Sequence, residues 1–132
     1  MTPRMLDSNT LSYLFRAHPA VSRRVASAEI STLCISSMVE AELRYGIARR
    51  PRATQMRHGM EQLLTRLDVL SWTSATAKRF GMLRAELEGM GRPLSLFDTL
   101  IAAHALEADA VLVTSDRAFG RVLGLKVEDW TQ

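Results

Sequence analysis

The chain has 132 residues, of which 47% are hydrophobic and 23% charged, a composition typical of one soluble globular domain over residues 1–132. No apolar run approaches the roughly 18 residues of a membrane span, and the first residues lack the apolar core of a secretion signal, so we expect a cytoplasmic protein with no membrane contact. The formal net charge is +3, and fifteen of the seventeen basic residues are arginine, the side chain suited to bidentate phosphate contacts.

Short apolar runs alternate with helical patterns along the chain. In order, we predict a strand at 3–7 ("PRMLD"), a helix at 11–19 capped by "SNT", a strand at 32–36 ("TLCIS"), a helix at 37–50, a helix at about 53–66, a strand at 67–72, a helix at 73–91, a helix at 95–106 ("SLFDTLIAAHAL"), a strand at 110–116 ("AVLVTSD"), a short helix from about residue 117 and a strand at 126–130. Strands that are fully apolar and separated by helices indicate an α/β fold with a mainly parallel sheet covered on both faces.

Two acidic residues directly follow predicted strands. Asp7 ends the first strand, and Asp116 follows "VLVTS". In a parallel sheet, the carboxyl ends of the strands form the edge where ligands bind. Helix capping is the alternative explanation for both residues, although Ser8, Asn9 and Thr10 offer other caps after the first strand.

The predicted helix at 37–50 contains two acids with different surroundings. Glu40 is explained by stability, because Ser37 and Glu40 have capping-box spacing and Arg44 follows four residues later. Glu42 has no such partner, since the position four residues on is Gly46. We therefore take Glu42 as the candidate for chemistry.

Asp98 lies beside the apolar face of the helix at 95–106. Four residues on is Ala102, so no helical ion-pair partner is offered. Ser95 and Asp98 also resemble a capping box, which would explain the acid without any function. Together with Asp7, Glu42 and Asp116, however, it completes a set of four acids that the predicted topology brings to one edge of the sheet. Close carboxylates repel, so a cation or protonation must relieve them, and oxygen ligands suit Mg²⁺.

The ordered segments "MLDSN", "ISSMVEAELRYG", "PLSLFDTLIAAHAL" and "VLVTSDRAFGRVLGLKVEDW" resemble the successive motifs of PIN-domain ribonucleases, and more closely the VapC toxins of bacterial toxin–antitoxin pairs. The resemblance covers about residues 4–130 and implies a three-layer α/β/α PIN-like fold. It places the acids of that family on Asp7, Glu42 and Asp98, with Asp116, or else Ser115, at the fourth position. Ser8 fills the hydroxyl position after the first acid, and Asn9 follows it.

The resemblance implies an endoribonuclease that depends on Mg²⁺ or Mn²⁺. In this scheme Asp7 and Asp98 bind the metal directly, Glu42 binds it or activates a water, and Asp116 positions that water or a second ion. Relatives of this type cut tRNA, in some cases initiator tRNA in the anticodon loop, which stops translation. We take four arginines near the acids as candidates for gripping RNA phosphates: Arg44, Arg49, Arg92 and Arg117.

The resemblance further implies partners. VapC toxins are usually homodimers held inactive by a cognate VapB antitoxin in a hetero-oligomer, and that complex contacts operator DNA only through the antitoxin. The alternative is a non-catalytic PIN-like module that binds RNA or a protein, which the complete acid set disfavours. A phosphotransferase on an open α/β sheet is disfavoured because position 9 is Asn where a second Asp is expected. We expect His104 and Cys34 to be core residues.

Overall fold

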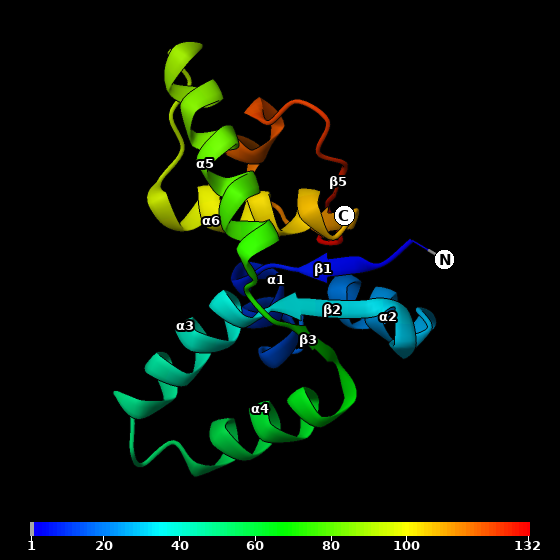
Figure 1. The fold of residues 1–132 in the computed structure, drawn as a ribbon. Helices are drawn as coiled ribbons and strands as arrows, with labels where there is room; N and C mark the ends of the chain where they lie inside the picture. Colours follow the sequence, from blue (N-terminus) through cyan, green and yellow to red (C-terminus); the bar gives the residue numbers. More distant parts are fainter. Residues whose placement is uncertain (1) are drawn as a thin grey trace.

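The computed structural model describes residues 2–132 and is built on a five-stranded sheet with the strand order β3-β2-β1-β4-β5 (Figure 1). Every neighbouring pair of strands is parallel. The strands are β1 (Arg4–Leu6), β2 (Leu33–Ser36), β3 (Asp68–Leu70), β4 (Val111–Val113) and β5 (Val127–Glu128). The predicted parallel α/β fold is therefore confirmed.

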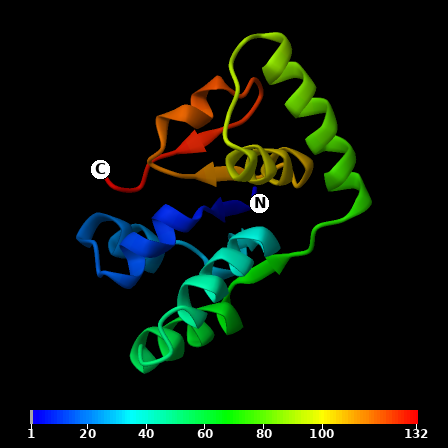
Figure 2. The same ribbon diagram turned by 90° about the vertical axis from the view of Figure 1, so that its left-hand side faces the viewer.

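Six α-helices and two short 3₁₀ helices connect the strands. They are α1 (Ser8–Phe15), α2 (Pro19–Ser27), η1 (Ile30–Thr32), α3 (Ser37–Ala48), α4 (Thr54–Arg66), α5 (Ser74–Gly89), α6 (Leu96–Glu107) and η2 (Arg117–Arg121). In Figure 2, α5 and α6 lie on one side of the sheet and α1 and α2 on the other, which gives the three layers of an α/β/α fold. Helices α3 and α4 form a hairpin beside β2 and β3 (Figure 1).

The first helical region differs from its prediction in two ways. Asp7 itself is the N-cap of α1, because its carboxylate accepts the backbone N–H of Thr10 at 2.8 Å, and the "SNT" residues already lie in the helix. The helix also ends at Phe15, followed by Ala17 with a positive φ of 57°. A separate helix, α2, then begins at Pro19, whose fixed φ suits a first helical position.

The cap of α3 is also corrected. Ser36, the last residue of β2, caps this helix by accepting the N–H of Met38 at 3.0 Å, so the predicted box between Ser37 and Glu40 is wrong. The Glu40–Arg44 ion pair is present at 2.8 Å. Ser95 caps α6 as expected, and its hydroxyl accepts the N–H of Asp98 at 3.1 Å.

The core lies between the sheet and the helices on both of its faces. Strands β2 and β4 are buried at every residue, which explains their continuous apolar sequences. Helix α6 is buried from Ile101 to Ala105, and its small alanines allow close approach to the sheet. Cys34 and His104 are both buried, as predicted.

The strand order places β1 at the centre, between β2 and β4. The chain leaves β1 toward β2 on one side, and it later returns to place β4 on the other side. This arrangement creates a topological switch point between β1 and β4, where open α/β sheets bind ligands beyond the strand ends. In Figure 1 the carboxyl ends of β1 and β2 point to the left, and Figure 2 looks toward that edge.

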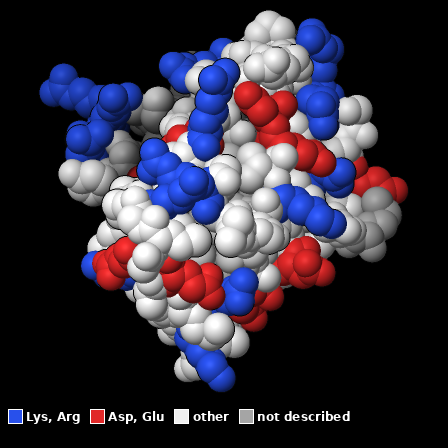
Figure 3. All heavy atoms as spheres, turned by 90° about the horizontal axis from the view of Figure 1, so that it is seen from above, with Lys and Arg blue, Asp and Glu red and all other residues white. Residues whose placement is uncertain are grey.

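Charges of both signs are interspersed on the face seen from above in Figure 3, which gives no single-sign field there. Within residues 2–132, no helix is both long enough and apolar enough to span a bilayer.

Candidate active site

Asp7 stands at the switch point, directly beyond β1. Its backbone N–H donates to the carbonyl oxygen of Val113 at 3.2 Å, so the residue continues the pairing of β1 with β4. The Thr10 hydroxyl donates to the same carbonyl oxygen at 2.9 Å and fixes the start of α1 against β4. Asp7 is only 6% exposed. The main chain of Asp7 is thus fixed to β4, and its carboxylate accepts the backbone N–H of Thr10.

Thr114 connects Asp7 with Asp116 and was not singled out from the sequence. It directly follows β4, is buried, and its hydroxyl accepts the N–H of Asp116 at 3.1 Å. Burial raises the pKa of Asp7, and the charge of Asp116 raises it further, while hydrogen bonds with Thr114 and Thr10 act against this rise. The signal for Thr114 was its place after β4, which mirrors the place of Asp7 after β1.

Asp98 lies in the first turn of α6. Burial is the largest cause of its raised pKa, and the negative charges of Asp116 and Glu42 raise it further, against a hydrogen bond with the Ser95 side chain. The cap of α6 uses the backbone N–H of Asp98 rather than its carboxylate. The Asp98 carboxylate is hydrogen-bonded to the side chain of Ser95, the cap residue, and no Lys or Arg among residues 2–132 pairs with it.

Glu42 projects from an exposed position on α3, and Asp116 caps the short helix η2 by accepting the N–H of Ala118 at 2.9 Å. Capping is thus a real function of Asp116, as it is of Asp7. Glu42 contrasts with Glu40, whose carboxylate is paired with Arg44.

Charge effects link the four predicted acids to one another in the order Asp7, Asp116, Asp98 and Glu42, but their side chains are not arranged as a set of metal ligands. The charges of Asp116 and Glu42 raise the pKa of Asp98, and the charge of Asp116 raises the pKa of Asp7. No group of three or more His, Cys, Asp or Glu side chains is arranged to hold a metal ion among residues 2–132. The metal role of these acids stays a prediction.

The chemistry of the four acids nevertheless fits a hard divalent cation. Within residues 2–132, the ion pairs to Arg involve Glu128, Glu40, Glu61 and Glu88, and none involves Asp7, Glu42, Asp98 or Asp116. Mg²⁺ takes few carboxylates and keeps several waters, so it does not need a closed protein cage.

The three supporting residues lie beside these acids. Ser8 and Asn9 are the first residues of α1, and both line a groove that also contains Glu42. Ser115 is half-buried between Thr114 and Asp116. No contact in the structure assigns Ser115 a role as the fourth ligand.

The groove just mentioned, which we call the α1–α3–α4 groove, has a volume of about 650 Å³. Its basic lining residues are Arg16, Arg49 and Arg50. Of these, only Arg49 was predicted as a substrate contact. Arg16 was missed because it caps the end of α1, far in sequence from the arginine-rich segment at residues 44–57.

The other three predicted arginines lie outside this groove. Arg44 is engaged by Glu40 at 2.8 Å and by Glu61 at 2.9 Å, which raises its pKa. Arg92 is exposed in the connection between α5 and α6, and Arg117 is exposed at the start of η2. The ion pairs of Arg44 compete directly with a role in holding RNA.

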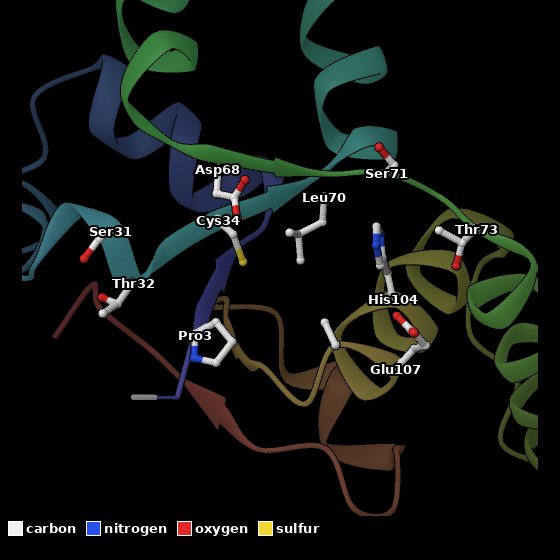
Figure 4. A pocket seen from close by; sticks show the side chains of 11 residues that line it. Pro3, Ser31, Thr32, Cys34, Asp68, Leu70, Ser71, Thr73, His104 and Glu107 are labelled. Carbon is white, nitrogen blue, oxygen red and sulfur yellow. The ribbon is translucent and has the colours of Figure 1, made fainter.

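A second cavity, of about 410 Å³, lies away from the acid edge and is lined by Cys34, Asp68, His104 and Glu107 among others (Figure 4). Burial raises the pKa of the Cys34 thiol to about 11, with a contribution from Asp68, so the thiol stays protonated and unreactive. His104 is hydrogen-bonded to Ser36 at 2.7 Å, as expected for a satisfied core histidine.

Comparisons with known proteins match this geometry to one family. A family model described as PIN domain matches residues 4–125. A Shigella flexneri protein named tRNA(fMet)-specific endonuclease VapC is 37% identical over 128 residues, which cover 96% of this chain and 97% of that protein. Ribonuclease VapC2 of Rickettsia felis is 34% identical, with 96% of both chains covered.

Solved structures agree with the sequence relatives. The crystal structure of DNA-bound VapBC from Salmonella typhimurium matches with a TM-score of 0.91 and 34% identity, and covers 98% of this chain and 99% of that chain. VapBC2 from Rickettsia felis, bound to a DNA fragment from its promoter, matches with a TM-score of 0.90, 33% identity and the same coverage. The carboxyl-edge acids, the parallel sheet and these full-length similarities together show that the chain belongs to the PIN domain family and, within it, to the VapC ribonucleases.

Proposed function

We propose that this VapC ribonuclease is a metal-dependent endoribonuclease toxin that uses Mg²⁺, or Mn²⁺ in its place, to cleave tRNA and thereby inhibit translation. Initiator tRNA is the substrate we favour, because relatives at 37% and 35% identity are named tRNA(fMet)-specific endonucleases. The observation that carries the proposal is that the charges of Asp116 and Glu42 both act on Asp98, while the charge of Asp116 also acts on Asp7, the residue directly beyond β1.

The residues divide into those that bind a cation and those that act on the proton of the attacking water. When bound, the divalent ion would lower the pKa of a water and stabilise negative charge on the phosphate. Asp7 and Asp98 are suited to hold it, because burial raises the pKa of both carboxylates and a neighbouring positive charge would favour their ionised forms.

Glu42 and Asp116 remain for the water. Glu42 is exposed and lines the α1–α3–α4 groove, so its carboxylate can accept a proton from a water that approaches RNA lying in that groove. Asp116 is fixed by Thr114 through its backbone N–H and by its own cap on η2, which gives its carboxylate a defined direction.

We also propose a VapB-type antitoxin as the partner of this chain, because the neighbours with TM-scores of 0.90 and 0.91 are VapBC complexes. In the proposed assembly the toxin forms a homodimer, and operator DNA is contacted only through the antitoxin.

The decisive experiment compares RNA cleavage by Asp98→Asn, Glu42→Gln and Glu40→Gln with that of the wild type. Removing a group that binds the cation or moves a proton is expected to slow Mg²⁺-dependent cleavage by at least about 100-fold. Glu40→Gln is the matched control, because it lies on the same helix and loses only a surface ion pair with Arg44. Equal rates for Glu42→Gln and Glu40→Gln would refute the role of Glu42.

Thermal unfolding gives a second measurement that does not depend on cleavage. A ligand that binds only the folded state raises the melting temperature with its concentration. We expect Mg²⁺ to raise the melting temperature of the wild type, and EDTA to reverse the change. The same titration should have little effect on Asp98→Asn. If both proteins respond alike, Asp98 does not bind the ion.

A further inference from the structure

The α1–α3–α4 groove contains one feature that hydrolysis alone does not explain. Tyr45 lines it and is 62% exposed. Among residues 2–132 it is the only aromatic residue in the set of exposed large hydrophobic side chains. An aromatic ring held in water beside a reaction site gains from burial only when another molecule covers it.

Helical geometry places Tyr45 on the same side as the proposed catalytic acid. Glu42 and Tyr45 are three residues apart on α3, a spacing that makes side chains neighbours along one helix face, and both line the groove. Whatever lies against Glu42 therefore also meets the tyrosine ring.

The surroundings of the ring are cationic. The guanidinium carbon of Arg49 lies 5.0 Å from the centroid of the Tyr45 ring. Arg16 and Arg50 line the same groove. One guanidinium group beside the ring and two more arginines in the same groove form a combination suited to single-stranded nucleic acid, because arginines attract phosphates and an aromatic ring stacks on a base.

We infer that Tyr45 is a stacking platform for one unpaired base next to the scissile phosphate, and that it directs cleavage to unpaired loops of RNA. This inference rests on the proposed ribonuclease function and adds a specificity residue to it. A base inside a duplex already stacks on its neighbours and offers no free face to the ring. An unpaired base does, so the ring favours loops over stems without reading the sequence.

A protein segment is the competing occupant of the groove. The charges favour RNA, because three arginines line the groove and, within the part of the chain that the structure describes, Glu42 is its only acidic lining residue. A phosphate backbone matches that excess of positive charge along its length.

The test uses Tyr45→Phe, Tyr45→Leu and Leu123→Ala. Phenylalanine keeps the ring and leucine removes it. Leu123 is 73% exposed and does not line the groove, so it serves as the control for losing an exposed apolar side chain. The probe is a synthetic hairpin RNA with the sequence of the initiator-tRNA anticodon arm, together with a series in which one loop base at a time is removed.

We expect Tyr45→Leu to raise the KM for the hairpin by about 10-fold, which corresponds to about 1.4 kcal/mol of lost stacking. Tyr45→Phe and Leu123→Ala should stay within about twofold of the wild type. One abasic position should weaken the wild type by a similar factor and have no further effect on Tyr45→Leu, because the same contact is removed only once.

Equilibrium binding of the same RNA is measured in an Asp98→Asn background, so that the stacking result stands apart from cleavage. Failure of the wild type to cleave with Mg²⁺ would refute the proposed function, while this binding assay would still report on Tyr45. The inference is overturned if Tyr45→Leu binds and cleaves like the wild type. It is also overturned if Tyr45→Phe weakens RNA binding as much as Tyr45→Leu does. The same holds if the effect of every abasic position simply adds to the effect of Tyr45→Leu. A Tyr45→Leu protein that handles RNA normally but escapes its antitoxin would assign the ring to the protein partner instead.

Discussion

Asp7 combines a structural and a proposed chemical role in one carboxylate. One of its oxygens caps α1 through the N–H of Thr10, while the group as a whole is almost fully buried. A helix N-terminus favours negative charge, whereas burial and Asp116 oppose it, and the raised pKa shows that the opposing effects are larger. The site therefore carries an electrostatic cost in the metal-free protein.

This balance predicts that Asp7→Asn stabilises the metal-free protein near neutral pH. Asparagine caps a helix about as well as aspartate but has no charge to bury, so we expect the free energy of unfolding to rise by about 1 kcal/mol, the scale of one pKa unit. Because the folded-state pKa of Asp7 lies above its usual 3.8, the wild type regains stability as the pH falls through that folded-state value. The gain of the variant should shrink over the same range.

Urea unfolding in EDTA at several pH values measures this difference. A variant that is less stable than the wild type at neutral pH would mean that the cap contributes more than the charge removes.

At the scale of single residues, the sequence identified Asp98 and Glu42 correctly as acids without a helical partner, and the structure leaves both unpaired with any Lys or Arg among residues 2–132. It did not reveal Thr114 or Arg16. Thr114 had a signal that was not used, its place directly after a predicted strand, whereas the place of Arg16 in the groove depends on which helices pack beside it, and a single sequence does not show that.

Between elements, one buried hydrogen bond joins the two helices that carry Glu42 and Asp98. His104 lies on α6, and its Nδ1 is 2.7 Å from the hydroxyl oxygen of Ser36, the residue that caps α3. The Trp72 ring lies edge-on to the imidazole, with the centroids 5.4 Å apart. His104 thus fixes the start of α3 relative to α6.

The burial of His104 predicts a loss of stability in mild acid. Burial lowers its pKa below the usual 6.5, against opposing effects from Glu107 and the Ser71 backbone. The unfolded chain therefore takes up a proton near pH 6.5 while the folded protein does not, so stability falls as the pH drops below that value.

His104→Gln should reduce stability at neutral pH by about 1–3 kcal/mol, because it disturbs the buried hydrogen bond with Ser36. The wild type loses up to about 1.4 kcal/mol of stability for each pH unit below 6.5, the ordinary pKa of histidine, and the variant should lack this loss. Urea unfolding of the two proteins between neutral pH and about pH 5 tests both points. Parallel pH profiles for the two proteins would show that His104 does not titrate on unfolding.

At the scale of elements, the strands were predictable because apolar runs such as "LCIS" and "VLV" are buried on both faces. Helix α2 was missed. Its sequence, "PAVSRRVAS", buries only Ala20 and Val21, and so it lacks the repeated apolar spacing that marks a helix packed along its length. The caps of α1 and α3 were misplaced by one to three residues, since several neighbouring Ser, Thr and Asp residues can each cap, whereas the cap of α6 was placed correctly.

For the molecule as a whole, the position of each arginine matters more than the net charge of +3. Arg49 lies in the α1–α3–α4 groove, while Arg44, on the same helix, is paired with Glu40 and Glu61. Proximity in sequence made the two equivalent candidates. The fold of α4 beside α3 separates them, because it places Glu61 next to Arg44.

These positions predict different salt dependences for RNA binding. Arg49→Ala should weaken binding and reduce the slope of log affinity against log salt by about 1, as expected for one lost phosphate contact. Arg44→Ala is the matched control and should leave the slope unchanged. Filter binding of the hairpin RNA at several salt concentrations, in the Asp98→Asn background, measures both. Equal slopes for the two variants would remove Arg49 from the RNA contacts.

The pairing of β1 with β4 also determines when, during synthesis of the chain, the acid edge can be assembled. Met5 pairs with Leu112, so the central strand gains this neighbour only after more than 100 further residues have been translated. Until that stretch leaves the ribosome exit tunnel, Asp7 has no Asp116 beside it and the acid edge stays split between finished and unmade polypeptide. The assembled acid edge, and with it the proposed nuclease activity, can therefore appear only after the residues of β4 and Asp116 have been translated.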